Sequence, residues 1–257
     1  VTLTASAAAS SINIGEIENA TTVGNITFTG TGSITADGAK AATSVGNISG
    51  SVASGETVDL TAEDATHCIG AASGTVGTTT VTGAGTFNMV IGAVTSVGDI
   101  DLSGMDATTS TSTIALNNTT TAGVTYTGSG GGDTFTGTGG ADTITPGLGI
   151  DSITGNDGAD SIIITEATAA VDTIVLTDDD SVDQVTGFTT TGADDVISFD
   201  VSALNTELGQ NLITTNGNAD VAATDAIAKY DITEGDTDNS TVVTADTNVI
   251  FFTDTDN

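Results

Sequence analysis

The chain of 257 residues lacks many of the side chains on which proteins commonly rely, since it has no Trp, one Pro and one Cys. A single cysteine excludes an internal disulfide, so another device must stabilise the fold. Basic residues are equally scarce, with Lys40 and Lys229 against 34 acidic residues and a net charge of -32. Binding nucleic acid or anionic lipid requires Lys or Arg to neutralise phosphates, so we expect neither as a partner.

The sequence is also poorly equipped for acid–base catalysis, because His67 is its one histidine. It adjoins Cys68, yet no G-x-S-x-G nucleophile elbow accompanies the pair and no histidine cluster could hold zinc. Asp194 and Asp195 would point to opposite faces of a strand, which does not suit a paired-carboxylate mechanism. No run approaches the roughly 18 apolar residues of a membrane helix. We therefore expect no enzyme activity and no membrane insertion.

The sequence is rich in glycine and has an uneven distribution of acidic residues. There are 33 glycines, and hydrophobic residues make up 37% of the chain with a positive mean hydropathy, which argues against a disordered acidic chain. Ten acidic residues lie in residues 1–127, and 24 lie in residues 128–257. This bias favours cation-binding carboxylates in the second half, with a solvated acidic surface as the alternative.

The first half contains a duplication. Residues 23–34 align without gaps on residues 76–87 at an offset of 53, and residues 45–48 (V-G-N-I) align on residues 97–100 (V-G-D-I) at an offset of 52. Each unit of about 52 residues carries a V-G-x-I/T element twice, 21 or 22 residues apart. Tandem units rich in β-branched residues and glycine predict stacked coils of short strands. A sandwich of short strands is the alternative.

From residue 128 the sequence period changes to nine. Four units follow, and each has Gly at its fourth position, Asp at its sixth and a large apolar residue at its eighth. Ordinary glycine-rich turns do not impose such a register. Each apolar position predicts the centre of a short strand, and the six residues before that strand predict a turn that offers carbonyl and carboxylate oxygens. The repeated residues are Gly131, Gly140, Gly149 and Gly158; Asp133, Asp142, Asp151 and Asp160; and Phe135, Ile144, Ile153 and Ile162.

These units resemble the RTX (repeats-in-toxin) nonapeptide G-G-x-G-x-D-x-U-x, whose family forms a calcium-loaded parallel β-roll. The resemblance implies two nonapeptides per coil and Ca²⁺ held between turns of adjacent coils, so that Asp133 stacks on Asp151 and Asp142 on Asp160. An all-oxygen shell suits Ca²⁺ better than a transition metal. Stacked carboxylates would repel one another without the ion, so folding should be coupled to calcium binding.

Other residues weaken or extend the pattern. Pro146 and Leu148 depart from it, so the third turn should be the poorest site. Asp172 begins a further strand signature after a three-residue insertion, and residues 178–180, all Asp, either ligate calcium or face water. The expected calcium ligands are Asp133, Asp142, Asp151, Asp157, Asp160 and Asp172, with Gly131, Gly140, Gly149 and Gly158.

Residues 183–201 resemble the segment that follows RTX repeats in proteins exported by type I secretion, where D-x-V-x-G-F and D-x-I-x-F form strands that close the roll. This resemblance implies an extracellular or bacterial cell-surface protein that is exported without a cleaved N-terminal signal peptide. The chain starts without Met and ends in a strand-like run, so we expect the natural protein to be longer. Helical pattern is confined to residues 202–208 and 220–230.

These patterns predict an all-β protein, with a right-handed parallel β-solenoid (β-helix) in residues 1–127, a calcium-binding RTX β-roll in 128–182, and a β-rich cap with a short helix in 183–257. The expected function is that of a calcium-dependent extracellular structural protein, an S-layer-like or matrix-fibre subunit that self-assembles. One alternative is an adhesin that binds a cell-surface polysaccharide or another surface through threonine rows such as Thr125/Thr127. Another is the secretion module of an exported hydrolase.

Overall fold

The structure, a computed structural model, describes residues 2–5, 11–14, 22–36, 44–60, 74–92, 94–105, 107–116, 122–164, 170–177, 181–188 and 195–199. These residues belong to one compact unit, Val1–Phe199, and they form strands and no helix. The predicted all-β class is therefore confirmed for them. Within the same segments no helix is long and apolar enough to cross a membrane. The helical patterns at 202–208 and 220–230 lie outside the described residues.

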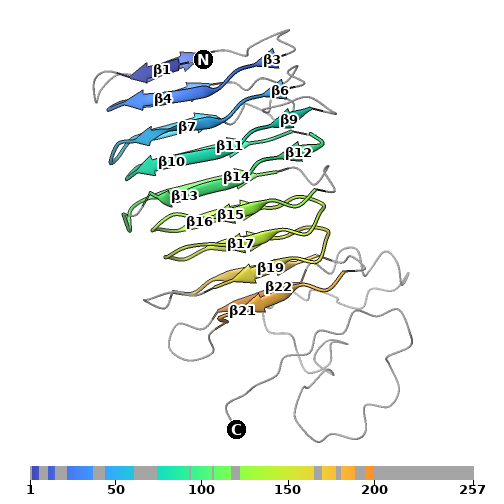
Figure 1. The fold of residues 1–257 in the computed structure, drawn as a ribbon. Coiled ribbons are helices and arrows are strands. Elements are labelled where there is room, and N and C mark those ends of the chain that lie inside the picture. The colour runs from blue at the N-terminus through green and yellow to red at the C-terminus, as the bar shows by residue number, and fades with distance from the viewer. Residues whose placement is uncertain are drawn as a thin grey trace, which may run out of the picture. The chain divides into compact units, whose positions relative to one another are not determined.

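The strands are arranged in three parallel sheets that extend along the stack in Figure 1. Sheet A consists of β1 (Thr2–Ala5), β4 (Ile26–Gly30), β7 (Ile48–Val52), β10 (Thr79–Gly83), β13 (Ile100–Gly104), β15 (Thr125–Thr127), β17 (Thr143–Thr145), β19 (Ser161–Ile163) and β21 (Gln184–Thr186). Sheet B consists of β2 (Ser11–Ile14), β5 (Ser33–Ala36), β8 (Thr57–Leu60), β11 (Thr86–Val90), β14 (Thr111–Ala115), β16 (Asp133–Thr136), β18 (Ser152–Thr154), β20 (Thr173–Leu176) and β22 (Val196–Phe199). Sheet C consists of β3 (Thr22–Val23), β6 (Ser44–Val45), β9 (Thr75–Val76) and β12 (Ser96–Val97).

Neighbouring strands in each sheet come from successive coils, which makes the fold a parallel β-solenoid. The valines of the repeated V-G element pair one coil apart in sheet C, at sequence separations of 22, 31 and 21 residues: Val23, Val45, Val76 and Val97. The duplicated unit of about 52 residues is therefore two coils. The longer of these coils includes residues 61–73, which lie outside the described residues.

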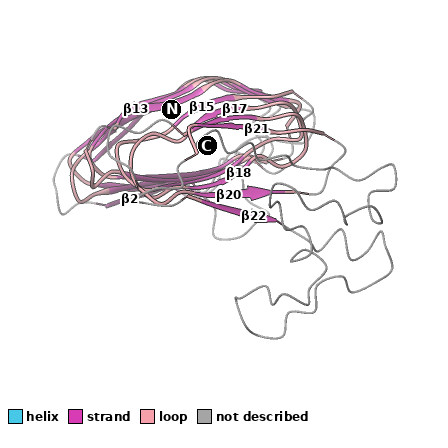
Figure 2. Cartoon of the chain, turned by 90° about the horizontal axis from the view of Figure 1, so that it is seen from below, coloured by secondary structure: helices cyan, strands magenta, loops and turns pink. Residues whose placement is uncertain are grey.

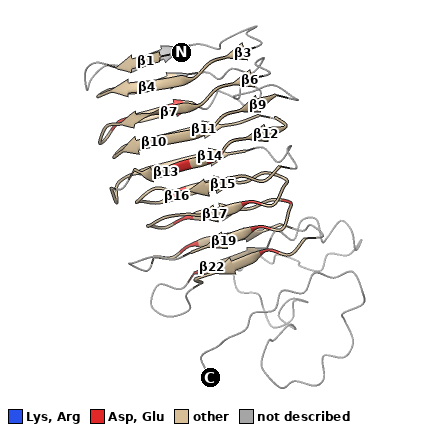
Figure 3. Cartoon of the chain, in the orientation of Figure 1, with Lys and Arg blue, Asp and Glu red and all other residues tan. Residues whose placement is uncertain are grey.

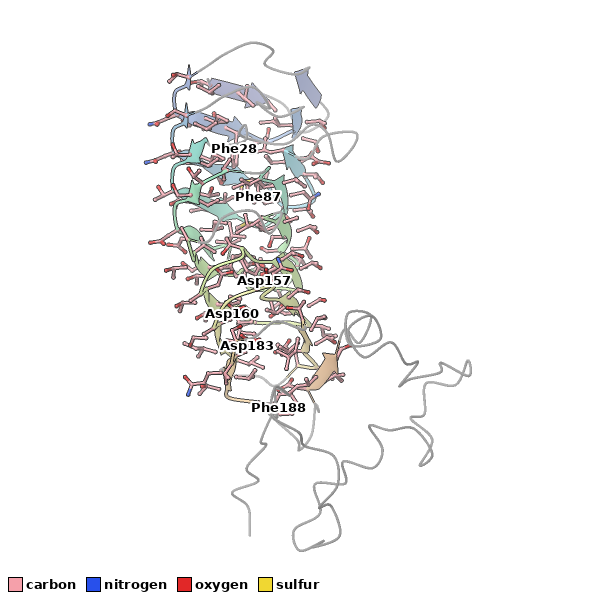
Figure 4. All side chains as sticks on the ribbon, turned by 90° about the vertical axis from the view of Figure 1, so that its right-hand side faces the viewer. Phe28, Phe87, Asp157, Asp160, Asp183 and Phe188 are labelled. Atoms are coloured by element: carbon pink, nitrogen blue, oxygen red, sulfur yellow. The ribbon has the colours of Figure 1, made fainter. Side chains whose placement is uncertain are left out.

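The core of the solenoid is built from one face of every strand. Side chains alternate along a strand, and β-branched residues suit the pleated surface, so the inward positions form one apolar column. Phe28 and Phe87 are fully buried, and their rings stack with centroids 5.7 Å apart (Figure 4). Gly50 lies beside Phe28 in the neighbouring strand, where a Cβ would collide with the aromatic ring. Glycine at that position makes room for the large core residue.

The coils become smaller after β12. Sheet C ends there, and each coil from β15 onward has one strand in sheet A and one in sheet B. Tyr126 pairs with Ile144 at a separation of 18 residues, so a coil contains two nonapeptides. Figure 2 shows the strands of the two sheets as facing layers. Two nine-residue segments supply two strands and two turns, which leaves no residues for a third strand.

The narrow core of this two-sheet roll matches the prediction from the nonapeptide register. Phe135, Ile144, Ile153 and Ile162 are fully buried. The ring of Tyr126 stacks on Phe135 with centroids 4.0 Å apart, so the core continues toward the solenoid. Strand β13 pairs with β15, and β14 pairs with β16, so both sheets run from the solenoid into the roll without interruption. At the other end, β21 and β22 add one more strand to each sheet.

Candidate metal site

Aspartates of the roll form two columns that run along the stack of coils. Each aspartate lies at the first residue of a strand or directly before it, so strand pairing places it beside the aspartate of the next coil. Figure 4 shows Asp160 and Asp183 at successive levels of the stack. This is the stacking that two nonapeptides per coil predict. Column 1 contains Asp133, Asp151, Asp172 and Asp195, and column 2 contains Asp142, Asp160 and Asp183.

Backbone amides link the aspartates of each column. In column 2 the N–H of Asp142 donates to Oδ1 of Asp160 at 2.8 Å, and the N–H of Asp160 donates to Oδ1 of Asp183 at 2.9 Å. Column 1 repeats the pattern at 2.7, 2.9 and 3.0 Å, with N–H donors on Asp133, Asp151 and Asp172. Each carboxylate therefore satisfies a backbone donor of the preceding coil, and this charge-assisted bond fixes its position.

Most of the column carboxylates are buried without a neutralising side chain. The exposed fractions are 0% for Asp172, 9% for Asp195, 2% for Asp133, and 1% for Asp142, Asp151 and Asp160. The basic residues and the histidine of the sequence lie outside the described residues: Lys40, His67 and Lys229. Figure 3 accordingly shows acidic positions, and no basic ones, on the described strands. A buried carboxylate without a partner cation is costly, so such a group binds a cation or takes up a proton.

Burial also changes the titration of the first aspartate in each column. It raises the pKa of the Asp133 carboxyl, although hydrogen bonds from neighbouring hydroxyl and backbone donors oppose the shift. Burial raises the pKa of Asp142 against the same kind of opposition. The pKa of the buried Tyr126 phenol is raised well above its usual value, by burial first and then by the charge of Asp133. The carboxyl groups of Asp133 and Asp142 thus lie where burial disfavours their negative charge.

Carboxylate oxygens lie beside carbonyl oxygens at the turns of the roll. A Cβ on Gly137 would collide with both Oδ2 of Asp142 and the carbonyl oxygen of Gly155. A Cβ on Gly155 would in the same way collide with Oδ2 of Asp160. Oδ2 is buried and accepts no hydrogen bond from the described residues in three column members, each of which accepts a backbone amide through Oδ1: Asp151, Asp160 and Asp172. Carboxylate and carbonyl oxygens of this kind are the donors that Ca²⁺ prefers.

Carboxylates alone do not complete a metal site in the described part of the chain, where no three His, Cys, Asp or Glu side chains converge. A bound ion would therefore take much of its coordination from backbone carbonyls. Ca²⁺ accepts carbonyl ligands readily, whereas structural zinc relies on Cys and His. The glycine-rich turns are therefore as much a part of the candidate site as the aspartates.

The four glycines at the predicted carbonyl positions stack in pairs. A Cβ on Gly149 would lie 2.6 Å from the carbonyl carbon of Gly131, and one on Gly158 would lie 2.5 Å from that of Gly140. Adjacent turns approach each other so closely that a side chain at the fourth position would force them apart. The carbonyl oxygen of Gly158 accepts a 2.6 Å hydrogen bond from the Ser181 hydroxyl.

The remaining predicted ligands have different locations. Asp172 lies in column 1, whereas Asp157 is exposed on the fourth turn and belongs to neither column, so its role as a ligand stays a prediction. Residues 178–180 lie outside the described residues. The nonapeptide register misses Asp183 and Asp195, which end the two columns. The signal that finds them is the spacing of Asp two residues before an apolar strand centre, which both share with Asp133.

No protein-family model matches the chain, and no curated protein or solved structure matches it significantly. The RTX resemblance therefore stays a prediction that rests on the nonapeptide run and on residues 183–201. His67 and Cys68 lie outside the described residues, so the expected absence of enzyme activity stays a prediction.

Proposed function

We propose that the two aspartate columns bind Ca²⁺ and that the chain is a calcium-dependent structural protein of the extracellular space or bacterial cell surface. The observation that carries the proposal is the burial of stacked carboxylates in a part of the chain without basic side chains. Carboxylates in such surroundings stay ionised at neutral pH when a cation neutralises them. The RTX-like register of the four nonapeptides supports calcium as that cation.

The donor atoms favour calcium over other biological cations. The columns and their turns offer carboxylate and carbonyl oxygens, and the described residues offer no His or Cys ligand. Ca²⁺ accepts roughly six to eight oxygen ligands in irregular geometry, whereas Mg²⁺ demands a near-ideal octahedron. A shell assembled from the turns of two adjacent coils suits the more permissive ion.

Calcium binding is coupled to folding of the roll in this proposal, because each shell draws its oxygens from two coils. The unfolded chain does not hold those oxygens together, so the free energy of ion binding stabilises the folded state. Extracellular modules bind calcium at roughly 10⁻⁴ to 10⁻³ M. The roll would then stay unfolded at the low calcium level of the cytosol and fold after export.

A structural role follows from the repetitive fold. Sheets A and B each contain nine strands that share one continuous apolar core. Repeat proteins of this kind extend by adding coils, and each coil is stabilised by its neighbours. An S-layer-like or matrix-fibre subunit, which self-assembles once calcium has ordered the roll, is the function that this combination supports best.

A surface-binding module is the second candidate, and the threonines on the outside of sheet A favour it. Thr125 pairs with Thr143, and Thr127 pairs with Thr145, so hydroxyl groups repeat at matching positions of adjacent coils. Thr125 and Thr143 are exposed, and the other two residues are half-buried. A regular array of hydroxyls suits a polysaccharide or another repetitive surface.

A calcium titration of the full chain, starting from a chelated sample, tests the proposal. Far-UV circular dichroism should gain β-structure as calcium is added, and electron microscopy should then show ordered sheets or fibres. A folded product that stays monomeric would favour the surface-binding module. β-Structure that is complete before calcium is added would contradict the ion-coupled mechanism.

A further inference from the structure

The nonapeptide turns are of two kinds. Four turns are named in chain order: turn 1 (residues 128–133), turn 2 (137–142), turn 3 (146–151) and turn 4 (155–160). The second residue of turns 1 and 2 carries a hydroxyl, as Ser129 and Thr138, whereas turns 3 and 4 have Gly147 and Asn156 there. Turn 3 lies one coil beyond turn 1, and turn 4 lies one coil beyond turn 2. Each aspartate column therefore includes one aspartate from a turn with the hydroxyl and one from a turn without it.

In turn 2 the hydroxyl residue binds the aspartate of its own turn. Thr138 Oγ1 donates to Oδ1 of Asp142 at 2.7 Å, and the Thr138 N–H donates to Oδ2 at 2.8 Å. Oδ1 also accepts the N–H of Val124 at 2.7 Å. The hydroxyl in turn accepts the N–H of Gly140 at 3.1 Å, which closes the turn. Three donors thus offset part of the cost of burying this carboxylate without a metal, although burial still raises its pKa.

Turn 1 repeats this arrangement, which we name the hydroxyl lock. Ser129 Oγ donates to Oδ1 of Asp133 at 2.9 Å, and the Ser129 N–H donates to Oδ2 at 2.5 Å. Oδ1 accepts the N–H of Ser112 at 2.7 Å, and Ser129 Oγ accepts the N–H of Gly131 at 3.2 Å. The same set of donors at both turns shows that the lock is a property of the Ser or Thr at the second position.

Turns 3 and 4 have no second-position hydroxyl that could form the lock. Gly147 has no side chain, and Asn156 Nδ2 donates to the carbonyl oxygen of Gly137 in the adjacent turn at 2.7 Å. The backbones also differ, since no residue of turns 1 and 2 has a positive φ, while φ lies between 71° and 113° at Gly147, Gly149, Asn156 and Gly158. Turns 1 and 2 therefore hold their buried carboxylates with a second-position hydroxyl, whereas turns 3 and 4 have a different backbone conformation and no such hydroxyl.

We infer that Ser129 and Thr138 replace a calcium ion at turns 1 and 2, so that calcium binding begins at turns 3 and 4. The inference rests on the proposed calcium binding and states where along the roll it starts. It differs from the expectation, based on Pro146 and Leu148, that turn 3 is the poorest site. Turns 1 and 2 flank β16, whose coil pairs directly with the solenoid through β13 and β14. That coil forms with the solenoid in the absence of calcium, and the calcium-dependent coils stack on it.

The calcium stoichiometry of four Asp-to-Asn variants of the full chain tests the inference. Asp142→Asn and Asp160→Asn change neighbouring members of column 2, and Asp133→Asn and Asp151→Asn do so in column 1, so each pair is matched for burial. Equilibrium dialysis should give the wild-type number of bound ions for the turn 1 and turn 2 variants, and about one ion fewer for each variant in turns 3 and 4. Equal losses within a pair would overturn the inference while leaving the proposed calcium binding intact.

Thermal unfolding in a chelator tests the hydroxyl lock independently of ion binding. Thr138→Val removes the hydroxyl and keeps the shape of the side chain, and Thr143→Val at an exposed position of β17 is the matched control. The Thr138→Val protein should melt several degrees below both the wild type and the control. Equal melting temperatures would overturn the lock. A wild-type chain that binds no calcium in dialysis would instead overturn the proposed function itself.

Discussion

The amide N–H of Asp142 donates a 2.8 Å hydrogen bond to Oδ1 of Asp160, which lies one coil further along the roll. Both residues are 1% exposed. The same link joins Asp133 to Asp151 at 2.7 Å. Each column is therefore a chain of carboxylates bound to backbone amides, and its negative charge accumulates inside the protein. In the proposed calcium-bound state, a cation held between the coils would offset the repulsion within a column, and removal of the cation would restore it.

Removing a buried carboxylate from a column should destabilise the calcium-bound protein. Asp172 is fully buried and accepts the N–H of Asp151 at 2.9 Å. We expect Asp172→Ala to lower the free energy of unfolding by about 1.5–3 kcal/mol, the range for a hydrogen bond to a charged group. Denaturant unfolding at saturating calcium measures the change. Asp99→Ala removes an exposed carboxylate of the solenoid, outside both columns, and should stay within about 0.5 kcal/mol of wild type, so an equal loss in both variants would contradict the column account.

A methyl group at Gly155, the first residue of turn 4, should disturb the carboxylate beside it. The new Cβ would collide with Oδ2 of Asp160, which forces that carboxylate out of its position. We expect Gly155→Ala to weaken calcium binding in titration calorimetry and to lower the free energy of unfolding by about 1–3 kcal/mol. Gly24→Ala is the matched control, because a Cβ there meets nothing within 4 Å and neither glycine has a positive φ. Equal calcium affinities in the two variants would show that no ion lies beside Gly155.

The calcium-free protein should be more stable in mild acid than at neutral pH. Burial raises the pKa values of Asp133 and Asp142, so between the ordinary carboxyl pKa and the raised value the folded chain binds more protons than the unfolded chain. The free energy of unfolding then falls as pH rises through that window. Protein dialysed free of calcium should melt at a higher temperature near about pH 4 than near about pH 7.

The double variant Asp133→Asn/Asp142→Asn serves as the control for this pH dependence. It removes both titrating groups, so its calcium-free melting temperature should vary less with pH than that of wild type. With saturating calcium the trend should reverse, because protons compete with the ion for the column carboxylates. A calcium-free wild type that loses stability in acid would be inconsistent with buried, destabilised carboxylates.

Magnesium should replace calcium poorly. A shell that combines carboxylates and turn carbonyls from two coils departs from the octahedral geometry that Mg²⁺ requires, and Mg²⁺ gives up its water ligands reluctantly. Calcium should therefore raise the melting temperature of the chelated chain, and the same concentration of magnesium should raise it much less. Equal stabilisation by the two ions would indicate screening of surface charge in place of a specific site.

The nonapeptide register predicts the central part of the roll for a physical reason. One apolar residue every nine positions gives one short strand per unit, and two units per coil bring Asp133 beside Asp151 and bury Phe135. The third sheet of the solenoid is harder to predict. Its strands are two residues long, and the V-G elements at Val45 and Val76 are 31 residues apart, so one coil does not share the spacing of the others.

The register does not predict the ends of the columns or the two kinds of turn. Beyond the fourth turn the period of nine is lost, because 12, 11 and 12 residues separate the successive column members Asp160, Asp172, Asp183 and Asp195. Ser129 and Thr138 are departures from the glycine of the consensus, and sequence spacing does not show whether a hydroxyl faces its own aspartate. That depends on the backbone of the turn and the side-chain rotamer, which only the structure provides.

Hydrogen exchange of the full chain, measured by mass spectrometry with calcium and with a chelator, tests most directly whether Ca²⁺ holds the aspartate columns together. The amides of Asp151 and Asp160 donate to column carboxylates, so their protection reports the order of the roll. Peptides within residues 146–164 should exchange slowly in calcium and rapidly in chelator, while peptides within residues 22–60 should exchange equally in both. Equally slow exchange of residues 146–164 in chelator would contradict the calcium-dependent account.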